Sequence, residues 1–388
     1  MAKRRGADAA LVAAWRARLC MPHHTVNVGG GHGGRGRTGY LRVRILKAAK
    51  PRTRYASEEI KESHVPLFTL DELEAAAAVV RTCVPLTPVY AWPLLARRTG
   101  AEVVVKHENH TPTGSFKARG ALTYVDALRL AGRMPRGLVT ATRGNHGQSV
   151  AIAAAHSGIP AVIVVPEGNS AEKNAAMQAL GGKLVTAGKD FDESRAIAAE
   201  MQHERGYHFV PSFHRELVKG VATYAHEFFA SRADLDAVFA PIGMGSGICG
   251  LITVRDLLGL KTEIVGVVAE NAPAFVLSLE AGRPFQTNAA RTFADGLACR
   301  DPQAEAFEII KNGAARVVLV SEEEIAEAIR IYYTTTHNLA EGAGAAPLAA
   351  LLKEKHRYAG KRVGLILSGG NIDMPAFAQI LRGLTPAV

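Results

Sequence analysis

The sequence predicts an α/β fold with two domains, each built on a doubly wound parallel sheet. From residue 67 onward, short apolar runs rich in Val, Ile and Ala alternate with Ala-rich segments of helical period. Several of these runs are followed directly by a glycine-containing loop that leads into a helical segment. In open parallel sheets such loops bind ligands beyond the carboxyl ends of the strands.

Individual elements follow from local composition. Thr69 and Glu72 have the spacing of a capping box and predict a helix that begins after Thr69. Further helices are expected over 148–156, 171–180, 192–204, 220–231 and 322–335, and strands over 102–105, 137–141, 161–165, 183–185, 237–241, 264–269, 316–320 and 363–367. No apolar run reaches the roughly 20 residues of a transmembrane helix, so we expect no contact with a membrane.

The basic character of the chain lies at its N-terminus. Of the net charge of +10, residues 1–55 contribute thirteen Lys and Arg against one acid, Asp8, whereas the remainder is close to neutral. A Gly- and Arg-rich run over 29–37 cannot bury apolar surface. Residues 1–60 are therefore predicted to be a largely disordered basic extension. An anion-binding arm, a targeting peptide, an upstream start and an extension without function all remain open, and we expect no nucleic-acid partner for the rest of the chain.

The four cysteines, Cys20, Cys83, Cys249 and Cys299, are widely scattered. Their spacing fits neither a zinc site nor a disulfide framework, which indicates a reducing compartment, and we expect a cytoplasmic protein.

Lys117 is the first candidate for chemistry. It follows a Pro-Thr-Gly turn and is flanked by Phe116 and by the small residue Ala118. A desolvated amine has a lowered pKa and can form a Schiff base with an aldehyde, whereas the alternative is a solvated lysine in the first turn of a helix.

Three later loops supply polar groups at predicted strand ends. Asn145 follows the strand over 137–141 and offers a side-chain amide, and Ser368 follows the strand over 363–367. The glycines over 243–247 follow a third strand and precede a helix, so their N–H groups can bind an anion. A dinucleotide would need an acidic residue about 20 residues further on; only Glu270 is near, so a monophosphate fits better.

Together these segments resemble the fold type II pyridoxal phosphate (PLP) enzymes, of the tryptophan synthase β-like kind, and within them the serine/threonine dehydratase (threonine ammonia-lyase) and serine racemase group. The matching motifs are TGSFKARGA at 113–121, GNHGQ at 144–148, GMGSG at 243–247, ADGLA at 294–298 and SGGN at 368–371, in the order of that group.

The resemblance implies a role for each matching position. Lys117 would carry the cofactor as a Schiff base and move the substrate's α-proton, and Asn145 would bond the cofactor's phenolic oxygen. Ser368 would face the pyridine nitrogen as a neutral partner. The remaining implied contacts are Phe116 beside the cofactor, Gly243, Met244, Gly245, Ser246 and Gly247 at its phosphate, and Ser115, Thr142, Asn145 and His146 at the substrate carboxylate.

Several positions depart from the group's pattern, among them Arg143 and Val276. Arg143 stands where the racemases have a serine that acts as a second base, and a guanidinium cannot take a proton, so racemisation is not expected. Arg143 is predicted either to bind a second substrate carboxylate or β-substituent, or to face outward and pair with an acid. The group's metal site would comprise Glu270 and Ala274, but Val276 replaces its second carboxylate, so no tight metal site is expected.

The sequence thus predicts a PLP-dependent lyase that deaminates a β-hydroxy amino acid, threonine or serine by default, in amino-acid catabolism. The alternatives are an ammonia-lyase for 3-hydroxyaspartate or another substituted serine and, more remotely, a PLP-binding or interaction protein without turnover. Residues 65–135 and 213–385 are expected to form a large cofactor-binding domain, and 136–212 a small mobile domain. A homodimer is expected from the resemblance.

Overall fold

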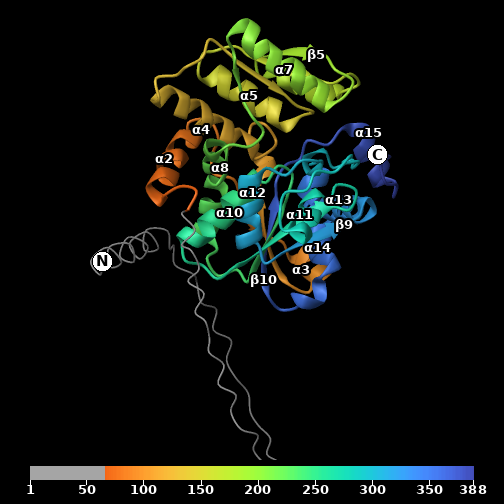
Figure 1. Cartoon of the computed structure of the whole chain (residues 1–388). Helices are drawn as coiled ribbons and strands as arrows, with labels where there is room; N and C mark the ends of the chain where they lie inside the picture. Colours follow the sequence, from red (N-terminus) through yellow and green to blue (C-terminus); the bar gives the residue numbers. More distant parts are fainter. Residues whose placement is uncertain (1–65) are drawn as a thin grey trace, which may run out of the picture. The chain divides into compact units, whose positions relative to one another are not determined.

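A computed structural model describes residues 66–388; the predicted extension over 1–60 lies outside the described residues. The helices are α2 (Leu70–Arg81), α3 (Pro93–Thr99), α4 (Lys117–Leu130), α5 (Asn145–His156), α6 (Ala171–Ala179), α7 (Phe191–Arg205), α8 (Arg215–Val221), α9 (Thr223–Ser231), α10 (Ser246–Leu257), α11 (Ala274–Ala281), α12 (Ala304–Gly313), α13 (Glu322–Thr336), α14 (Gly342–Lys353) and α15 (Met374–Leu381), with 3₁₀ turns η1 (Glu108–His110), η2 (Asp295–Leu297) and η3 (Lys355–Arg357) (Figure 1).

The strands form two sheets. Their bounds are β1 (Val89–Ala91), β2 (Glu102–His107), β3 (Leu138–Ala141), β4 (Ala161–Val165), β5 (Gly182–Thr186), β6 (His208–Phe209), β7 (Ala237–Pro241), β8 (Glu263–Ala269), β9 (Arg316–Val320) and β10 (Arg362–Leu367). One sheet has six strands in the order β1-β2-β10-β7-β8-β9, and the other has four in the order β5-β4-β3-β6. All pairs are parallel except β1 with β2, which confirms the predicted α/β class and adds one antiparallel edge strand.

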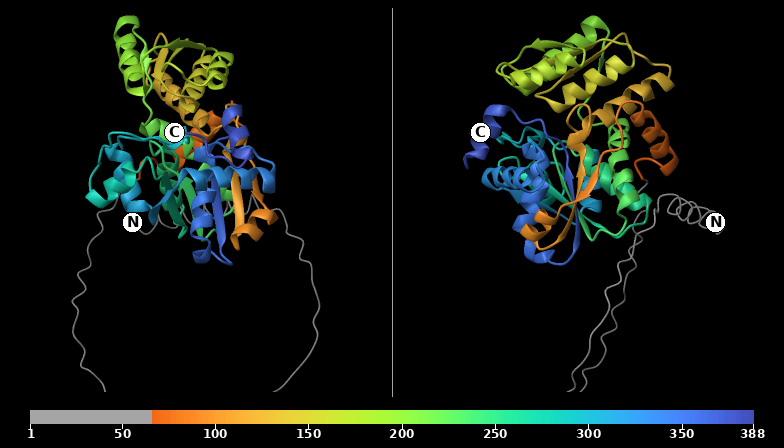
Figure 2. Two further views of the ribbon diagram at one scale, coloured as in Figure 1. Left: turned by 90° about the vertical axis from the view of Figure 1, so that its right-hand side faces the viewer. Right: turned by 180° about the vertical axis from the view of Figure 1, so that it is seen from behind.

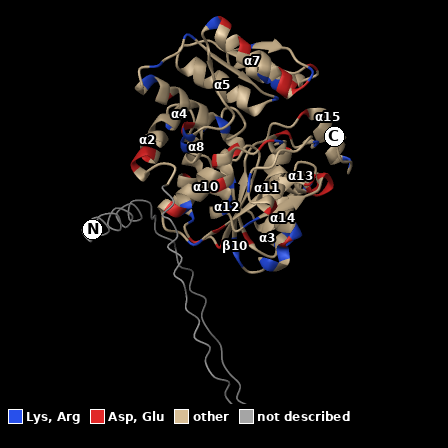
Figure 3. Cartoon of the chain, in the orientation of Figure 1, with Lys and Arg blue, Asp and Glu red and all other residues tan. Residues whose placement is uncertain are grey.

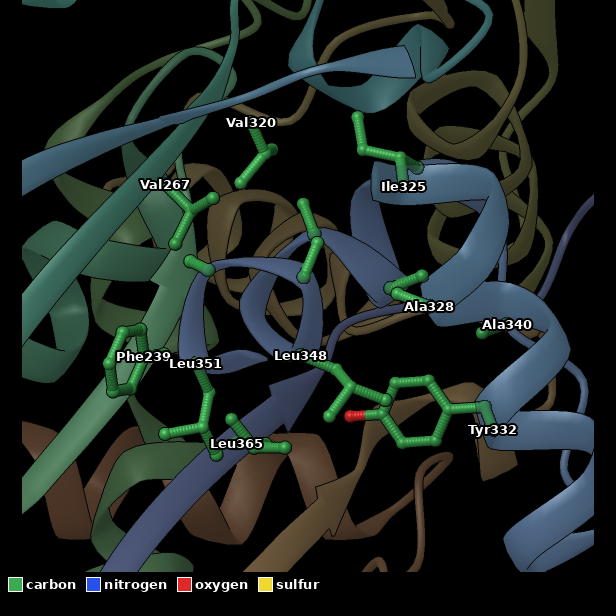
Figure 4. Packing of buried hydrophobic residues seen from close by; sticks show 14 of the residues in the cluster. Phe239, Val267, Val320, Ile325, Ala328, Tyr332, Ala340, Leu348, Leu351 and Leu365 are labelled. Carbon is green, nitrogen blue, oxygen red and sulfur yellow. The ribbon is translucent and has the colours of Figure 1, made fainter. Parts of the chain in front are cut away.

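The six-stranded sheet is covered by helices on both faces. Successive side chains of a strand point to opposite sides, so each strand contributes to both layers of the core. On β2, Val103 and Val105 belong to the cluster that packs against α13 and α14, whereas Val104 belongs to the cluster under α9 and α10. Figure 4 shows the first cluster, in which Phe239 and Leu365 of the sheet lie near Leu351 and Tyr332 of the covering helices.

The four-stranded sheet is also covered on both faces. Ala151 of α5 and Met177 of α6 pack with Ile163 on one side, and Ala198 of α7 packs with Val162 on the other. This sheet, drawn in yellow and green, lies at one end of the described chain in both views of Figure 2. Its strands all fall between residues 138 and 209, inside the predicted small domain of 136–212.

Charged side chains of both signs are interspersed over the described residues (Figure 3), as expected from their near-neutral balance. Among residues 66–388, no helix is both long and apolar enough to cross a membrane. Cys83, Cys249 and Cys299 form no disulfide, and burial raises the pKa of the Cys249 thiol above its usual range.

Candidate active site

Loops from both sheets line two adjoining cavities. The wide cavity, of about 390 Å³, lies between the loop after β3 and residues of the six-stranded-sheet region. The narrow cavity, of about 30 Å³, lies beside the loop after β7. Lys117, Asn145, Gly243 and Glu341 line both. The predicted site residues that line the narrow cavity are Phe116, Lys117, Asn145, Gly243, Met244, Gly245, Ser246, Gly247 and Ser368.

Lys117 is the first residue of α4. The preceding turn contains Gly114 in the left-handed region at φ +66°, and it pairs with the loop after β10 through a bridge between Ser115 and Gly369. The Phe116 N–H donates to the Ser368 carbonyl at 3.1 Å. Burial lowers the pKa of Lys117, with the Glu341 carboxylate opposing the shift. The lysine is thus a desolvated amine in a cavity, as its sequence context predicts.

The glycine loop over 243–247 connects β7 to α10. Gly245 is the N-cap of α10 at φ +97°, a conformation that favours glycine, and a Cβ at Gly243 would overlap the Gly296 carbonyl. Within the described residues, the N–H groups of Gly243, Met244 and Gly245 donate no hydrogen bond. Free N–H groups at a helix N-terminus favour an anion such as a phosphate.

The loop after β3 brings Thr142, Arg143, Asn145 and His146 to the wide cavity. The Thr142 hydroxyl accepts from the Gly144 N–H at 3.0 Å and fixes the turn into α5. Burial, followed by the nearby charge of Lys117, lowers the pKa of His146 to about 4. His146 is therefore neutral near pH 7 and can donate a hydrogen bond without adding a charge.

Arg143 is exposed at the wide cavity. The sequence left two possibilities for Arg143: binding a substrate group, or facing outward and pairing with an acid. Within residues 66–388, no acidic side chain forms an ion pair with it. Its guanidinium is therefore available to a ligand or to solvent.

Ser115 is the predicted substrate residue that lines neither cavity. Its hydroxyl is buried and has no hydrogen-bond partner within the described residues. Ser368 is also buried, at 2% exposure, but it lines the narrow cavity from the end of β10.

Glu341 is a site residue that the sequence analysis did not identify. It precedes α14, lines both cavities, and accepts from Nδ2 of Asn145 on both carboxylate oxygens, at 2.9 and 3.0 Å. Burial raises its pKa, against the Asn145 hydrogen bond and the charges of Lys173 and Lys117. The one signal in the sequence was an acid directly before the Gly-Ala-Gly run over 342–344.

Polar contacts join the two sheet regions around the wide cavity. Lys173 of α6 pairs with Asp295 at 2.6 Å, and Arg300 pairs with Asp192 at 2.9 Å. The Ser170 hydroxyl donates to Asp373 at 2.7 Å. These contacts hold the two walls of the cavity together.

A buried ion network lies behind Lys117 on α4. Arg119 has no exposed surface, and its guanidinium donates to both carboxylate oxygens of Glu108 and both of Glu227. Lys106 also donates to Glu227, at 2.6 Å. Two cations and two carboxylates balance their charges here, and Arg119 links the start of α4 to Glu108 of η1 and Glu227 of α9.

The region of the predicted weak metal site is occupied by an ion pair. Glu270 lies 3.3 Å from Nζ of Lys353, Ala274 begins α11, and the Val276 side chain offers no oxygen. Residues 66–388 contain no group of three or more His, Cys, Asp or Glu side chains arranged to hold a metal ion.

Comparison with known proteins gives consistent matches. Residues 80–369 match the family model described as "Pyridoxal-phosphate dependent enzyme". The chain is 35% identical over 316 residues to the L-threonine ammonia-lyase of Thermotoga maritima, covering 81% of this chain and 78% of that protein. Among solved structures, the threonine deaminase of T.th. superposes with a TM-score of 0.74 at 35% identity, covering 79% of this chain and 99% of that one. A maize serine racemase superposes with a TM-score of 0.75 at 26% identity, covering 81% and 97%.

Proposed function

Because the chain belongs to the family of pyridoxal-phosphate dependent enzymes, we propose that it is an ammonia-lyase that converts a β-hydroxy amino acid, L-threonine or serine, to a 2-oxo acid and ammonia. One observation carries the proposal: a desolvated lysine, a free N–H cradle and a neutral ring partner line one cavity. The similarity to proteins named threonine ammonia-lyase and threonine deaminase favours threonine.

The residues fit the cofactor. The free N–H groups over 243–245 suit its phosphate, and a Cβ at Gly243 would block that approach. Phe116 and Ser368 offer a ring face and a neutral hydroxyl. We assign the phosphate to the 243–247 loop, the pyridine nitrogen to Ser368, the phenolic oxygen to Asn145 and the aldehyde carbon to Lys117.

Pyridoxal phosphate, when bound, supplies an aldehyde that joins an amine and a conjugated ring that spreads the negative charge left by the departing α-proton. Burial lowers the pKa of Lys117, which favours the neutral amine whose Nζ would take this proton. Ser368, which lines the same cavity, would offer the pyridine nitrogen a neutral hydroxyl rather than a charged partner.

The substrate carboxylate is assigned to the loop after β3. Thr142, Asn145 and His146 present neutral donors to the wide cavity, and His146 stays neutral because its pKa is low. Ser115 is proposed as a further donor to this carboxylate, since its buried hydroxyl has no partner within the described residues. Arg143 provides no second base, so we expect elimination without racemisation.

The second candidate is an ammonia-lyase for 3-hydroxyaspartate or another substituted serine. It is favoured by Arg143, which lies at the wide cavity with no acidic partner among the described residues. A substrate with a distal carboxylate would give this guanidinium a charge-assisted pair.

Assay of the holoenzyme against L-serine, L-threonine and 3-hydroxyaspartate for 2-oxo acid and ammonia tests both candidates. If Arg143 binds a distal carboxylate, Arg143→Ala should lower kcat/KM for 3-hydroxyaspartate about tenfold or more and leave that for threonine nearly unchanged. Equal losses for the three substrates would contradict this role of Arg143. A protein that binds pyridoxal phosphate but turns over none of the β-hydroxy amino acids would favour the non-catalytic alternative.

Activity is expected to be independent of divalent cations. Glu270 is held by Lys353, and Val276 supplies no second carboxylate, so hard cations find too few oxygens. Dialysis against EDTA should leave kcat and KM for threonine unchanged. Loss of activity that Mg²⁺ restores would contradict the expectation.

We also propose a domain motion, a cellular setting and an oligomeric state. Residues 136–212 are proposed to move as a unit over the substrate, and the Lys173–Asp295 pair would close the cavity. A cytoplasmic, reducing setting is supported by the free thiols of Cys83, Cys249 and Cys299. A homodimer is proposed from the resemblance to this family.

A further inference from the structure

Glu341 lies where several loops of the site converge. Its N–H donates to the Gly369 carbonyl at 3.1 Å, which ties the start of α14 to the loop after β10. A Cβ on Gly369 would lie 2.5 Å from Oε1 of Glu341, and one on Gly296 would lie 3.9 Å from it. The carboxylate therefore lies against the backbone of two loops. Any residue larger than glycine at position 369 would collide with it.

The side chain of Asn145 is held at both ends. Its Nδ2 donates to the two carboxylate oxygens of Glu341, and its Oδ1 accepts from Nδ2 of Asn371 at 2.7 Å. Asn371 is fixed in turn, because its Nδ2 also donates to the Thr113 carbonyl at 2.8 Å. An acceptor at one end and a donor at the other allow only one orientation of the Asn145 amide.

This arrangement leaves one N–H of Asn145 free. The two oxygens of a single carboxylate are close together, whereas the two N–H bonds of an amide diverge widely, so Glu341 engages only one of them. Asn145 lines the narrow cavity, and within the described residues Nδ2 has no other acceptor. The second N–H is thus available to a ligand in that cavity.

The charge of Glu341 is balanced from several elements. Lys117 of α4 and Lys173 of α6 oppose the burial of the carboxylate, whereas Asp295 of η2 adds to its cost. Lys173 is itself paired with Asp295. The carboxylate of Glu341 therefore interacts with charges from three elements of the site. Its hydrogen bond to Asn145 is its main directional contact.

We propose that Glu341 is a positioning residue: together with Asn371 it fixes the amide of Asn145 so that one N–H faces the ring oxygen of pyridoxal phosphate. What position 341 must supply is a hydrogen-bond acceptor. The inference rests on the proposed cofactor assignment, and it is independent of which amino acid is the substrate.

The test is titration of the apoprotein with pyridoxal phosphate, followed by the visible band of the bound cofactor. Glu341→Ala and Asn371→Ala should each weaken binding about tenfold or more, the typical effect of losing a hydrogen bond that orients a charged or polar ligand group. Glu341→Gln keeps an acceptor and should bind within about threefold of wild type. Asp301→Ala, which removes another acid of the wide cavity, is the matched control and should bind as wild type does.

Thermal unfolding of each apoprotein separates positioning from folding. If Glu341→Ala does not fold, Asn371→Ala reports on the same amide from its other end. Wild-type cofactor affinity in both alanine variants, or equal losses in Glu341→Gln and Glu341→Ala, would overturn the proposal. Because the readout is cofactor binding, these outcomes are distinguishable from a failure of the proposed lyase activity.

Discussion

Replacing Lys117 with alanine is expected to remove the visible absorption band of the lysine-bound cofactor and to lower kcat for the preferred substrate by at least about a thousandfold. The side chain is a desolvated amine that lines both cavities, and it is proposed to hold the cofactor and to take the α-proton. Spectra of the reconstituted variant and initial rates of 2-oxo acid formation measure the two effects.

A lysine outside the site provides the control for this variant. Lys183 lies exposed on β5 and lines neither cavity, so Lys183→Ala should keep both the band and the activity. The other amine at the wide cavity is Lys173, which is committed to Asp295. A Lys117→Ala protein that retains the band would mean that a different amine carries the cofactor.

The second large effect is expected on stability. Arg119→Met should reduce the free energy of unfolding by about 3–5 kcal/mol, because it leaves Glu108 and Glu227 buried with Lys106 as their remaining cation. Urea denaturation of the apoprotein measures the change.

The same helix offers the control for the buried network. Arg129 of α4 pairs with Asp126 at the surface, where its side chain is 62% exposed, and Arg129→Met should cost less than about 1 kcal/mol. Similar losses in the two variants would contradict the special role of the buried network.

Prediction of the fold from sequence succeeded where strands are buried. All eight predicted strands are present, and the clearest signals are continuous, fully buried apolar runs such as Ala161–Val165. The short strands β1 and β6 were not predicted, since three and two residues give no periodic signal. The helix predicted over 220–231 is divided at Ala222 into α8 and α9, and Gly220 packs directly against α4 there.

The candidate site was predicted where its residues occur in recognisable local motifs. Lys117, Asn145 and the 243–247 loop each follow a strand or turn with a readable pattern, and the structure brings them to one cavity. Glu341 has no such pattern, and its partner Asn145 lies 196 residues away in the chain. Its place depends on how α14 meets the loop after β3, which only the tertiary structure shows.

The most direct test of the account is the product analysis of L-threonine with purified holoenzyme. We expect 2-oxobutanoate and ammonia in equal amounts, with no accumulation of the Cα epimer D-allo-threonine, and loss of both products in Lys117→Ala. A cofactor-loaded protein that releases neither product from any β-hydroxy amino acid, or that racemises its substrate without releasing ammonia, would contradict it.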